Sequence, residues 1–436
     1  MTKVNDFTLF SLLKSMFKVA DCGVGLQGEI GWSIMRVVIF NPHLSMTDRF
    51  TTTTTTGYGS RIMNSIKGVV GFILFVASFG VLYWNEGRVD MSQIAVTAVD
   101  ISATTQDTAN DGKLVSTTGV FTSEETIGDN MFLNADKYLA VTRKVEMYAW
   151  EETSESKSTT NVGGSETTET TYKYDKVWTE NPQKSSDFKQ PQGHENPAKT
   201  LEGDTVTVEK ATLGVYGLDV PKLELPEFAD LQLTATNVTA KDGAVLAEGG
   251  KYLFIAKVAG SSLNAPAVGD MRISYSVLYP GKDGTVFGKL EGSNISPYFD
   301  EKNNKLYRVF SGTRDEAIAQ MHDEYTMMLW IFRAVGFLMM WIGLAALFGP
   351  ISVLLDFLPV FGQISRALIG GIAFIVSLVL SGVTILVSML LHNVVALVIS
   401  IVVVVGVIIG VMIMIKKKKA SGSGPAAPAA PVAPTV

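Results

Sequence analysis

The sequence has little of the side-chain chemistry that builds covalent staples and metal sites. Its 436 residues include one cysteine, Cys22, and four histidines. One thiol cannot form an intramolecular disulfide, so the core alone must hold any folded domain. No histidine lies in an HExxH motif, and no GxSxG, P-loop or kinase signature occurs. We therefore expect no metal site, no cofactor and no catalytic residues.

Positive charge is scarce in the middle of the chain. Residues 91–325 contain 22 Lys and Arg against 35 Asp and Glu, a net charge of −13. Nucleic-acid binding needs clustered basic side chains, so no nucleic-acid partner is expected. The carboxylates are scattered among Ser and Thr, which favours a solvated surface over an acid/base pair.

Long hydrophobic runs lie outside this acidic region. Each is close to the ~20 apolar residues that cross a bilayer core. The four runs are residues 66–84, 327–348, 367–391 and 394–415. The last two lack Asp, Glu, Lys and Arg and are separated only by His392-Asn393, which favours a helical hairpin. The sequence therefore predicts an integral, multi-pass protein with the lipid bilayer as a partner.

Basic residues flank these runs on one side. They are Arg61, Lys67, Arg366 and Lys416–Lys419. Because such residues face the cytosol, residues 90–325 are expected to be extracytosolic. We expect residues 46–65 to be a polar cytosolic N-terminus. The Ala- and Pro-rich stretch within 416–436 is expected to be a disordered cytosolic tail.

The acidic region alternates apolar and polar residues in short runs separated by turn signals, which predicts β-strands. Two such runs, 143–150 and 171–178, suggest a long hairpin. The stretch between them, 151–170, is rich in Ser, Thr, Glu and Gly and is expected to be a mobile loop. The predicted fold class is an α+β membrane protein. A large β-rich extracytosolic domain is inserted between the first and second of four transmembrane helices.

Two further segments carry separate expectations. Residues 1–45 are a doubtful N-terminal extension, and we expect translation to start near Met46. Their single GxGxxG follows a helical run, the wrong order for a dinucleotide site. Residues 350–366 are expected to lie on the cytosolic face as an interfacial helix, with Asp356 toward water. The alternative is a re-entrant loop in which Asp356 is buried and functional.

Three charged residues near the first two spans are candidate partner or interface residues. Glu86 and Arg88 follow the first span, and the pattern favours a helix stop over a recognition motif. Arg333 lies two turns into the second span. It snorkels to the interface or pairs with an acid of the domain, or else it marks function.

Three residues of the acidic region are weak candidates of the same kind. Trp150 and Trp178 could stack on a sugar or peptide, although cross-strand packing explains them better. His194, within Gly193–Pro197, could line a ligand pocket. The turn chemistry of its neighbours favours an ordinary loop.

Several of these stretches carry a family resemblance. The chain resembles the LUMA family, also called transmembrane protein 43, in motifs that follow the family order from about residue 60 to 415. The matching stretches are RKVEMYAWEE at 143–152, YKYDKVWTE at 172–180, NEGR at 85–88, GHENP at 193–197, VGDMRISY at 268–275 and the residues around Arg333 and Asp356. The resemblance implies four spans with one lumenal domain after the first, and no catalytic residues.

These observations favour a non-catalytic membrane scaffold that organises protein complexes or membrane structure. Eukaryotic relatives look like organisers of complexes at the inner nuclear membrane, which implies other membrane proteins as partners. A homo-oligomer is an open alternative. The expected location is the inner membrane of a bacterium, or the endoplasmic reticulum or inner nuclear membrane of a eukaryote. The alternative functions are a transporter or channel component and a membrane-tethered hydrolase of envelope or lipid material.

Overall fold

The computed structural model describes residues 48–57, 59–60, 66–161, 164–349 and 361–392. The chain divides into two compact units. We call the one that includes residues 89–328 the domain unit, and the one that includes 66–88, 329–348 and 369–392 the helical unit. Residues 1–45, the fourth predicted span, the tail and Asp356 lie outside the described residues.

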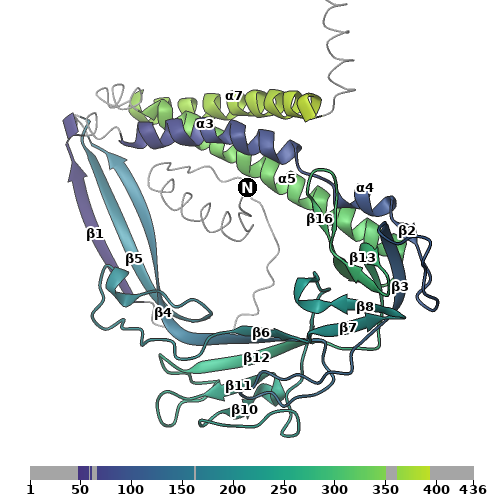
Figure 1. Cartoon of the computed structure of the whole chain (residues 1–436). Coiled ribbons are helices and arrows are strands. Elements are labelled where there is room, and N and C mark those ends of the chain that lie inside the picture. Colours follow the sequence, from purple (N-terminus) through teal and green to yellow (C-terminus); the bar gives the residue numbers. More distant parts are fainter. Residues whose placement is uncertain (1–47, 58, 61–65, 162–163, 350–360, 393–436) are drawn as a thin grey trace, which may run out of the picture. The chain divides into compact units, whose positions relative to one another are not determined.

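The first sheet of the domain unit has eight strands, in the order β1-β5-β4-β12-β11-β10, with β6 on β4 and β9 on β12. All of its pairings are antiparallel (Figure 1). Its strands are β1 (Asp48–Thr56), β4 (Ala140–Thr160), β5 (Glu166–Thr179), β6 (Asp204–Thr207), β9 (Ala229–Asp230), β10 (Val245–Ala247), β11 (Tyr252–Ile255) and β12 (Met271–Leu278).

The second sheet has seven strands, in the order β17-β13-β14-β8-β7-β3-β2, and β13 also pairs with β3. Its strands are β2 (Val99–Asp100), β3 (Leu114–Thr122), β7 (Lys210–Leu213), β8 (Tyr216–Asp219), β13 (Asp283–Glu291), β14 (Asn294–Ser296) and β17 (Arg308–Ser311). Two further strands, β15 (Tyr298–Phe299) and β16 (Lys305–Leu306), pair with each other. The β-rich prediction for residues 90–325 is therefore confirmed.

The core of the first sheet follows from the two-residue period of its strands. In β4, Val141, Val145, Met147 and Ala149 are buried, whereas the alternate residues Thr142, Lys144, Glu146 and Tyr148 are more exposed. Partner strand β12 buries Ile273, Tyr275 and Val277 in the same cluster. Full burial of a large apolar side chain stabilises a fold by about 1.5–3 kcal/mol, so this alternating face anchors the sheet.

The hairpin of β4 and β5 is longer than the sequence predicted. The strands pair without interruption from Met147↔Thr179 to Thr160↔Glu166, so only residues 161–165 separate them in the sequence. The expectation of a mobile loop over 151–170 was therefore wrong for most of that stretch. Threonine favours strands, and hydroxyl pairs such as Ser156–Thr170 (2.8 Å) and Ser158–Thr168 (2.8 Å) link the two strands.

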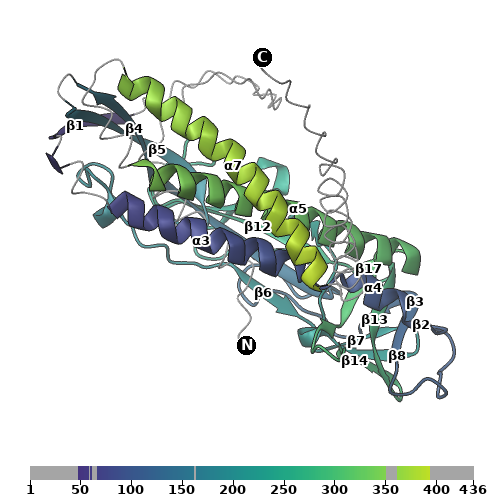
Figure 2. The same ribbon diagram turned by 90° about the horizontal axis from the view of Figure 1, so that it is seen from above.

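The third strand of this extension comes from before the first hydrophobic run. β1 pairs with β5 over nine residues, from Asp48↔Tyr174 to Thr56↔Glu166, and both views show β1, β5 and β4 side by side (Figures 1 and 2). Two strands can pair only on one side of a membrane. This pairing therefore cannot coexist with a cytosolic 46–65 and an extracytosolic 90–325.

The helical unit contains α3 (Ile66–Glu86), α7 (Phe361–His392) from Ile369 onward and the C-terminal part of α5 (Arg314–Leu347). α3 and α5 run antiparallel, because an added Cβ at Gly71 would meet Ala346, whereas one at Gly336 would meet Leu82. These two glycines allow close helix contact, as small residues do in membrane bundles.

Three helices in the described part of the chain are long and apolar enough to span a membrane: Val69–Val96, Arg314–Leu347 and Leu368–His392. Only 17% to 33% of the residues in their apolar windows are buried, so most of these side chains are free to face lipid. The prediction of an α+β protein with apolar helices and a β-rich body is confirmed. Four spans and their topology remain predictions.

Candidate functional site

Several ionisable side chains of the helical unit meet at the C-terminal end of α3. The Arg333 guanidinium of α5 donates through Nε and Nη2 to the two Glu86 carboxylate oxygens of α3, both at 2.8 Å. The two side chains are 15% and 3% exposed. Two parallel charge-assisted hydrogen bonds offset much of the free energy lost when both charges leave water. Glu86 and Arg333 therefore meet each other, and the expected partner from the acidic domain is not needed.

Arg88 lies one helical turn beyond Asn85, at the same end. Its guanidinium carbon lies 5.7 Å from the Trp84 ring centre and 5.5 Å from that of Phe332. Asn85 is fully buried and donates through Nδ2 to the Leu329 carbonyl at 3.0 Å. We call Asn85, Glu86, Arg88, Arg333 and His392 the polar end of the helical unit.

His392 belongs to this end through its ring contacts. Its ring lies 4.6 Å from that of Tyr83 in a tilted arrangement, and its Nε2 lies against the α carbon of Gly87, where an added Cβ would clash. Its Nδ1 lies 2.8 Å from the Ser388 carbonyl. Gly87 therefore ends α3 and also leaves room for this ring, which extends the helix-stop interpretation of the NEGR motif.

His194 forms a second cluster, in the domain unit at the base of the β4–β5 extension. Its ring stacks on Tyr174 at 3.9 Å and meets Trp150 edge-on at 4.7 Å. Its Nδ1 lies 3.0 Å from the Gln190 carbonyl, and its Nε2 lies 3.4 Å from an Asp48 carboxylate oxygen at the start of β1. His194 is only 3% exposed, which fits the loop interpretation.

Asn196 fixes the loop that carries His194. Its Oδ1 accepts from the Trp150 backbone N–H at 2.7 Å, and its Nδ2 donates to the Trp150 carbonyl at 2.8 Å. Nδ2 also donates to the Gln183 carbonyl at 2.9 Å. The side chain therefore takes the place of a neighbouring strand beside β4.

Glu152 ties the same loop to Tyr174, since its Oε2 accepts from the Tyr174 hydroxyl at 2.7 Å. Burial and this bond raise the pKa of Tyr174 to about 12, so it stays neutral. Trp178 lies apart from this cluster. It packs at 5.2 Å on Tyr148, and the Arg272 guanidinium lies 4.8 Å from its ring. Cross-strand packing therefore accounts for Trp178.

Sequence reasoning missed a buried polar group in the core of the first sheet. Arg143 donates to Asp129 at 2.8 Å, and the Tyr275 hydroxyl donates to the same carboxylate. Burial alone would raise the pKa of Asp129, but the bonds from Tyr275 and Arg143 outweigh it and hold that pKa below its usual value. Arg143 stands in phase with the apolar residues of β4. In the sequence, the signal for this buried group was a charged residue at a β4 position whose side chain should face the core.

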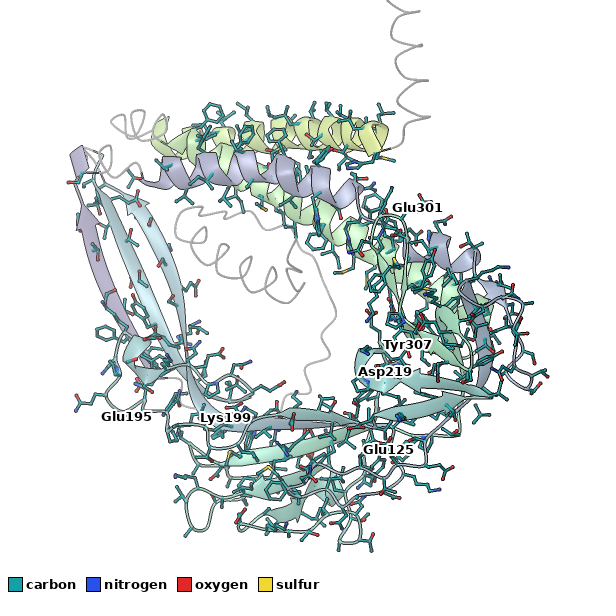
Figure 3. All side chains as sticks on the ribbon, in the orientation of Figure 1. Glu125, Glu195, Lys199, Asp219, Glu301 and Tyr307 are labelled. Atoms are coloured by element: carbon teal, nitrogen blue, oxygen red, sulfur yellow. The ribbon has the colours of Figure 1, made fainter. Side chains whose placement is uncertain are left out.

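A shallow depression of about 600 Å³ opens beside β4, and four of its charged residues form two ion pairs. Lys144 lies 3.1 Å from Glu180, and Lys199 lies 2.9 Å from Glu202. Figure 3 marks Lys199 near Glu195 in this part of the domain unit. Within the described residues, no group of three His, Cys, Asp or Glu side chains could hold a metal ion.

Known proteins resemble this chain over most of its length. The family described as Transmembrane protein 43 matches residues 147–394, more than half of the chain. The chain belongs to the transmembrane protein 43 family. Transmembrane protein 43 of Rattus norvegicus is 25% identical over 351 residues, 76% of this chain and 85% of the relative. The homolog of Drosophila melanogaster is 29% identical over 295 residues, 63% of this chain and 74% of the relative.

Human Transmembrane protein 43 is also 25% identical, over 353 residues. No solved structure matches the chain. The family match includes Trp150, Trp178, His194 and Arg333, so both clusters draw on matched sequence. The resemblance stated from the motifs is thus confirmed. The described residues alone include three apolar helices long enough to span a membrane, so the protein is an integral membrane protein in contact with a bilayer.

Proposed function

We propose that this member of the transmembrane protein 43 family is a non-catalytic membrane scaffold. It holds partner proteins through the outer part of the first sheet. We call β1, β4 from Thr153 onward and β5 up to Tyr172 the arm. The observation that carries the proposal is the open edge of β4 in the arm.

The two faces of the arm are largely open to solvent. β1 is exposed at seven of its nine positions, and β4 is exposed from Thr153 to Thr159. Apart from the neighbouring rings of Phe50 and Tyr172, 6.4 Å apart and tilted, the arm carries mainly hydroxyl and charged side chains. A sheet without a core on either face contributes little to its own stability. Its length is better explained by binding.

One edge of the arm offers backbone groups to a partner. Up to Glu152, the outer edge of β4 is occupied by Asn196, Gln183 and Asp270. From Thr153 to Thr159, no described strand pairs with that edge. Such an edge can accept an extended segment of another protein as an added strand. The charged side chains of Glu155 and Lys157 on β4 would favour a partner segment of complementary charge.

Three carboxylates of the domain unit support a non-catalytic role, because each already binds a neighbouring side chain. Asp129 binds Arg143 and Tyr275, Glu146 binds Arg272 at 2.7 Å, and Glu152 binds Tyr174. A general base needs a proton-accepting oxygen within reach of substrate, and these oxygens hold structural contacts. The hydrolase alternative therefore gains no support from them.

An arm-deletion variant tests the scaffold proposal. Residues 154–172 would be replaced by Asn-Gly, which leaves the Thr153↔Lys173 pair to close a short hairpin. We expect the variant to reach the membrane and to lose the proteins that chemical cross-linking captures with the wild type. Thr168→Ala, which removes one hydroxyl pair of the arm, serves as the matched control and should keep them.

Two results would contradict the proposal. One is an unchanged set of cross-linked proteins after arm deletion. The other is ion flux through the purified protein in planar bilayers, which would favour the transporter or channel alternative.

A further inference from the structure

Four arginines in the described part of the chain lie over aromatic rings, and one of them, Arg88, has no carboxylate as an ion-pair partner there. Arg272, Arg308 and Arg333 each contact an acid at 2.6 to 2.8 Å in addition to a ring. Arg88 lies over Trp84 and Phe332, yet its Nη1 is buried without a hydrogen-bond partner in the described structure. A buried guanidinium nitrogen of this kind is costly unless a hydrogen-bond acceptor completes it, and an anionic oxygen is the strongest such acceptor.

The polar end cannot supply that anion itself. Its one carboxylate, Glu86, already binds Arg333 through both oxygens. The next carboxylate in the chain, Asp90, accepts from the Ser92 hydroxyl at 2.6 Å and lies 2.9 Å from His322. Two arginines against one glutamate leave the polar end with a net positive charge.

A second orphan atom lies one turn away. Asn85 is fully buried, and its Oδ1 has no hydrogen-bond donor among the described residues. The Arg88 backbone N–H donates to the Asn85 carbonyl at 3.3 Å, so the two residues belong to one turn. The site therefore calls for a ligand with an anionic oxygen for Arg88 and a donor for Asn85.

The exposed aromatic residues around the polar end indicate its depth. Tyr83, Trp84 and Trp330 are 48%, 48% and 63% exposed. Tyr and Trp gather at the level of lipid headgroups, where an apolar ring and a polar group are both accommodated. A headgroup phosphate is the anion most abundant at that depth.

We propose that the polar end binds the headgroup of one phospholipid. The phosphate binds Arg88, and a hydrogen-bond donor of the headgroup binds Asn85 Oδ1. Ethanolamine and glycerol headgroups carry such a donor, whereas choline does not. The site therefore prefers phosphatidylethanolamine or phosphatidylglycerol to phosphatidylcholine. This inference does not depend on the scaffold proposal, because the arm takes no part in it.

Native mass spectrometry of the full-length protein in detergent tests the site. The protein would be incubated with each of the three phospholipids or with inorganic phosphate. We expect wild type to retain one phosphatidylethanolamine or phosphatidylglycerol molecule. Arg88→Gln should retain it at least about tenfold more weakly, because a charge-assisted bond is lost. Arg88→Lys should restore part of the binding.

Lys176→Gln is the matched control, because it removes a cation 4.5 Å from the Trp150 ring outside the helical unit. It should bind lipid as wild type does, and melting curves would show that each variant is folded. Equal retention by Arg88→Gln would overturn the proposal. Equal retention of phosphatidylcholine would overturn the role of Asn85. Stabilisation by inorganic phosphate alone, equal to that by lipid, would show a soluble anion site instead.

Discussion

The two halves of the β4–β5 hairpin are built from the same backbone pattern but hold together differently. Near its base, β4 buries Val145, Met147 and Ala149 against β12. Beyond Glu152 the same strands continue with hydroxyl side chains that bond across the hairpin and bury almost nothing. Burial of apolar side chains fixes the register of a strand, because a shift by one residue would turn those side chains toward water. Hydroxyl pairs are compatible with the register but do not fix it.

The same contrast applies to polar groups. In the base, Asp129 and Arg143 are enclosed, and three backbone N–H groups donate to Asp129 Oδ1 at 2.8 to 2.9 Å. In the arm, Glu155 lies 3.7 Å from Lys173 and is 80% exposed. Water solvates the second pair in the unfolded and folded states alike, so only the first should matter for stability.

The largest expected effect is the loss of Asp129. Asp129→Ala leaves Arg143 buried without its partner and should lower the free energy of unfolding by about 3–5 kcal/mol. Thermal or guanidinium unfolding of the purified protein measures this. Glu155→Ala removes the matched carboxylate of the arm and should change stability by less than about 0.5 kcal/mol. Similar losses for the two variants would contradict the comparison.

Lowering the pH should remove the stabilisation that Asp129 contributes to the wild-type protein. The pKa of Asp129 is lowered on folding, so its stabilising effect is complete above the unfolded pKa of about 3.9. The effect is lost as the pH falls through the folded pKa. The difference in melting temperature between wild type and Asp129→Ala should therefore shrink below about pH 4. A constant difference down to pH 2 would count against this linkage.

A smaller effect is expected at the junction of base and arm. Asn196→Ala removes three hydrogen bonds to backbone groups of β4 and its neighbouring loop, and should cost about 1–3 kcal/mol. Asn161→Ala, at the exposed tip, loses only side-chain bonds to Ser165 and Thr167 and should cost less than about 0.5 kcal/mol. Differential scanning fluorimetry of both variants would show whether the loop is held as tightly as its geometry indicates.

The difference between the base of the first sheet and the arm could be predicted from the sequence only in part. The apolar runs and the alternation around Val141–Ala149 gave the helices and the base of the sheet. The arm was missed because Ser, Glu and Gly are common in loops, and the strand preference of Thr alone does not decide between a loop and a paired strand. Glu86 and Arg333 are 247 residues apart, so their ion pair depends on how the helices pack. Asn196 and Asp129 likewise depend on contacts that no local pattern encodes.

A disulfide across the arm should have the smallest effect on stability, but whether it forms tests the membrane topology. Thr52 and Thr170 are direct partners in the β1–β5 register, and Ser156 is the next partner in that row, on β4. In a Cys22→Ser background, Thr52→Cys with Thr170→Cys should form a disulfide under mild oxidation, because cross-strand partners lie within bonding reach. Thr52→Cys with Ser156→Cys should not, because two strand spacings are about 9.6 Å.

Formation of the first disulfide alone would place residues 48–56 on the same side of the membrane as the hairpin. α3 would then begin and end on that side, and the expectation that it crosses would fail. The remaining topology is read by labelling single cysteines at Thr53, Ser165 and Ser421 in sealed cells. If no disulfide forms and Thr53 is labelled from the side opposite to Ser165, α3 crosses the bilayer. β1 then does not pair with β5 in the membrane, and the arm is reduced to β4 and β5.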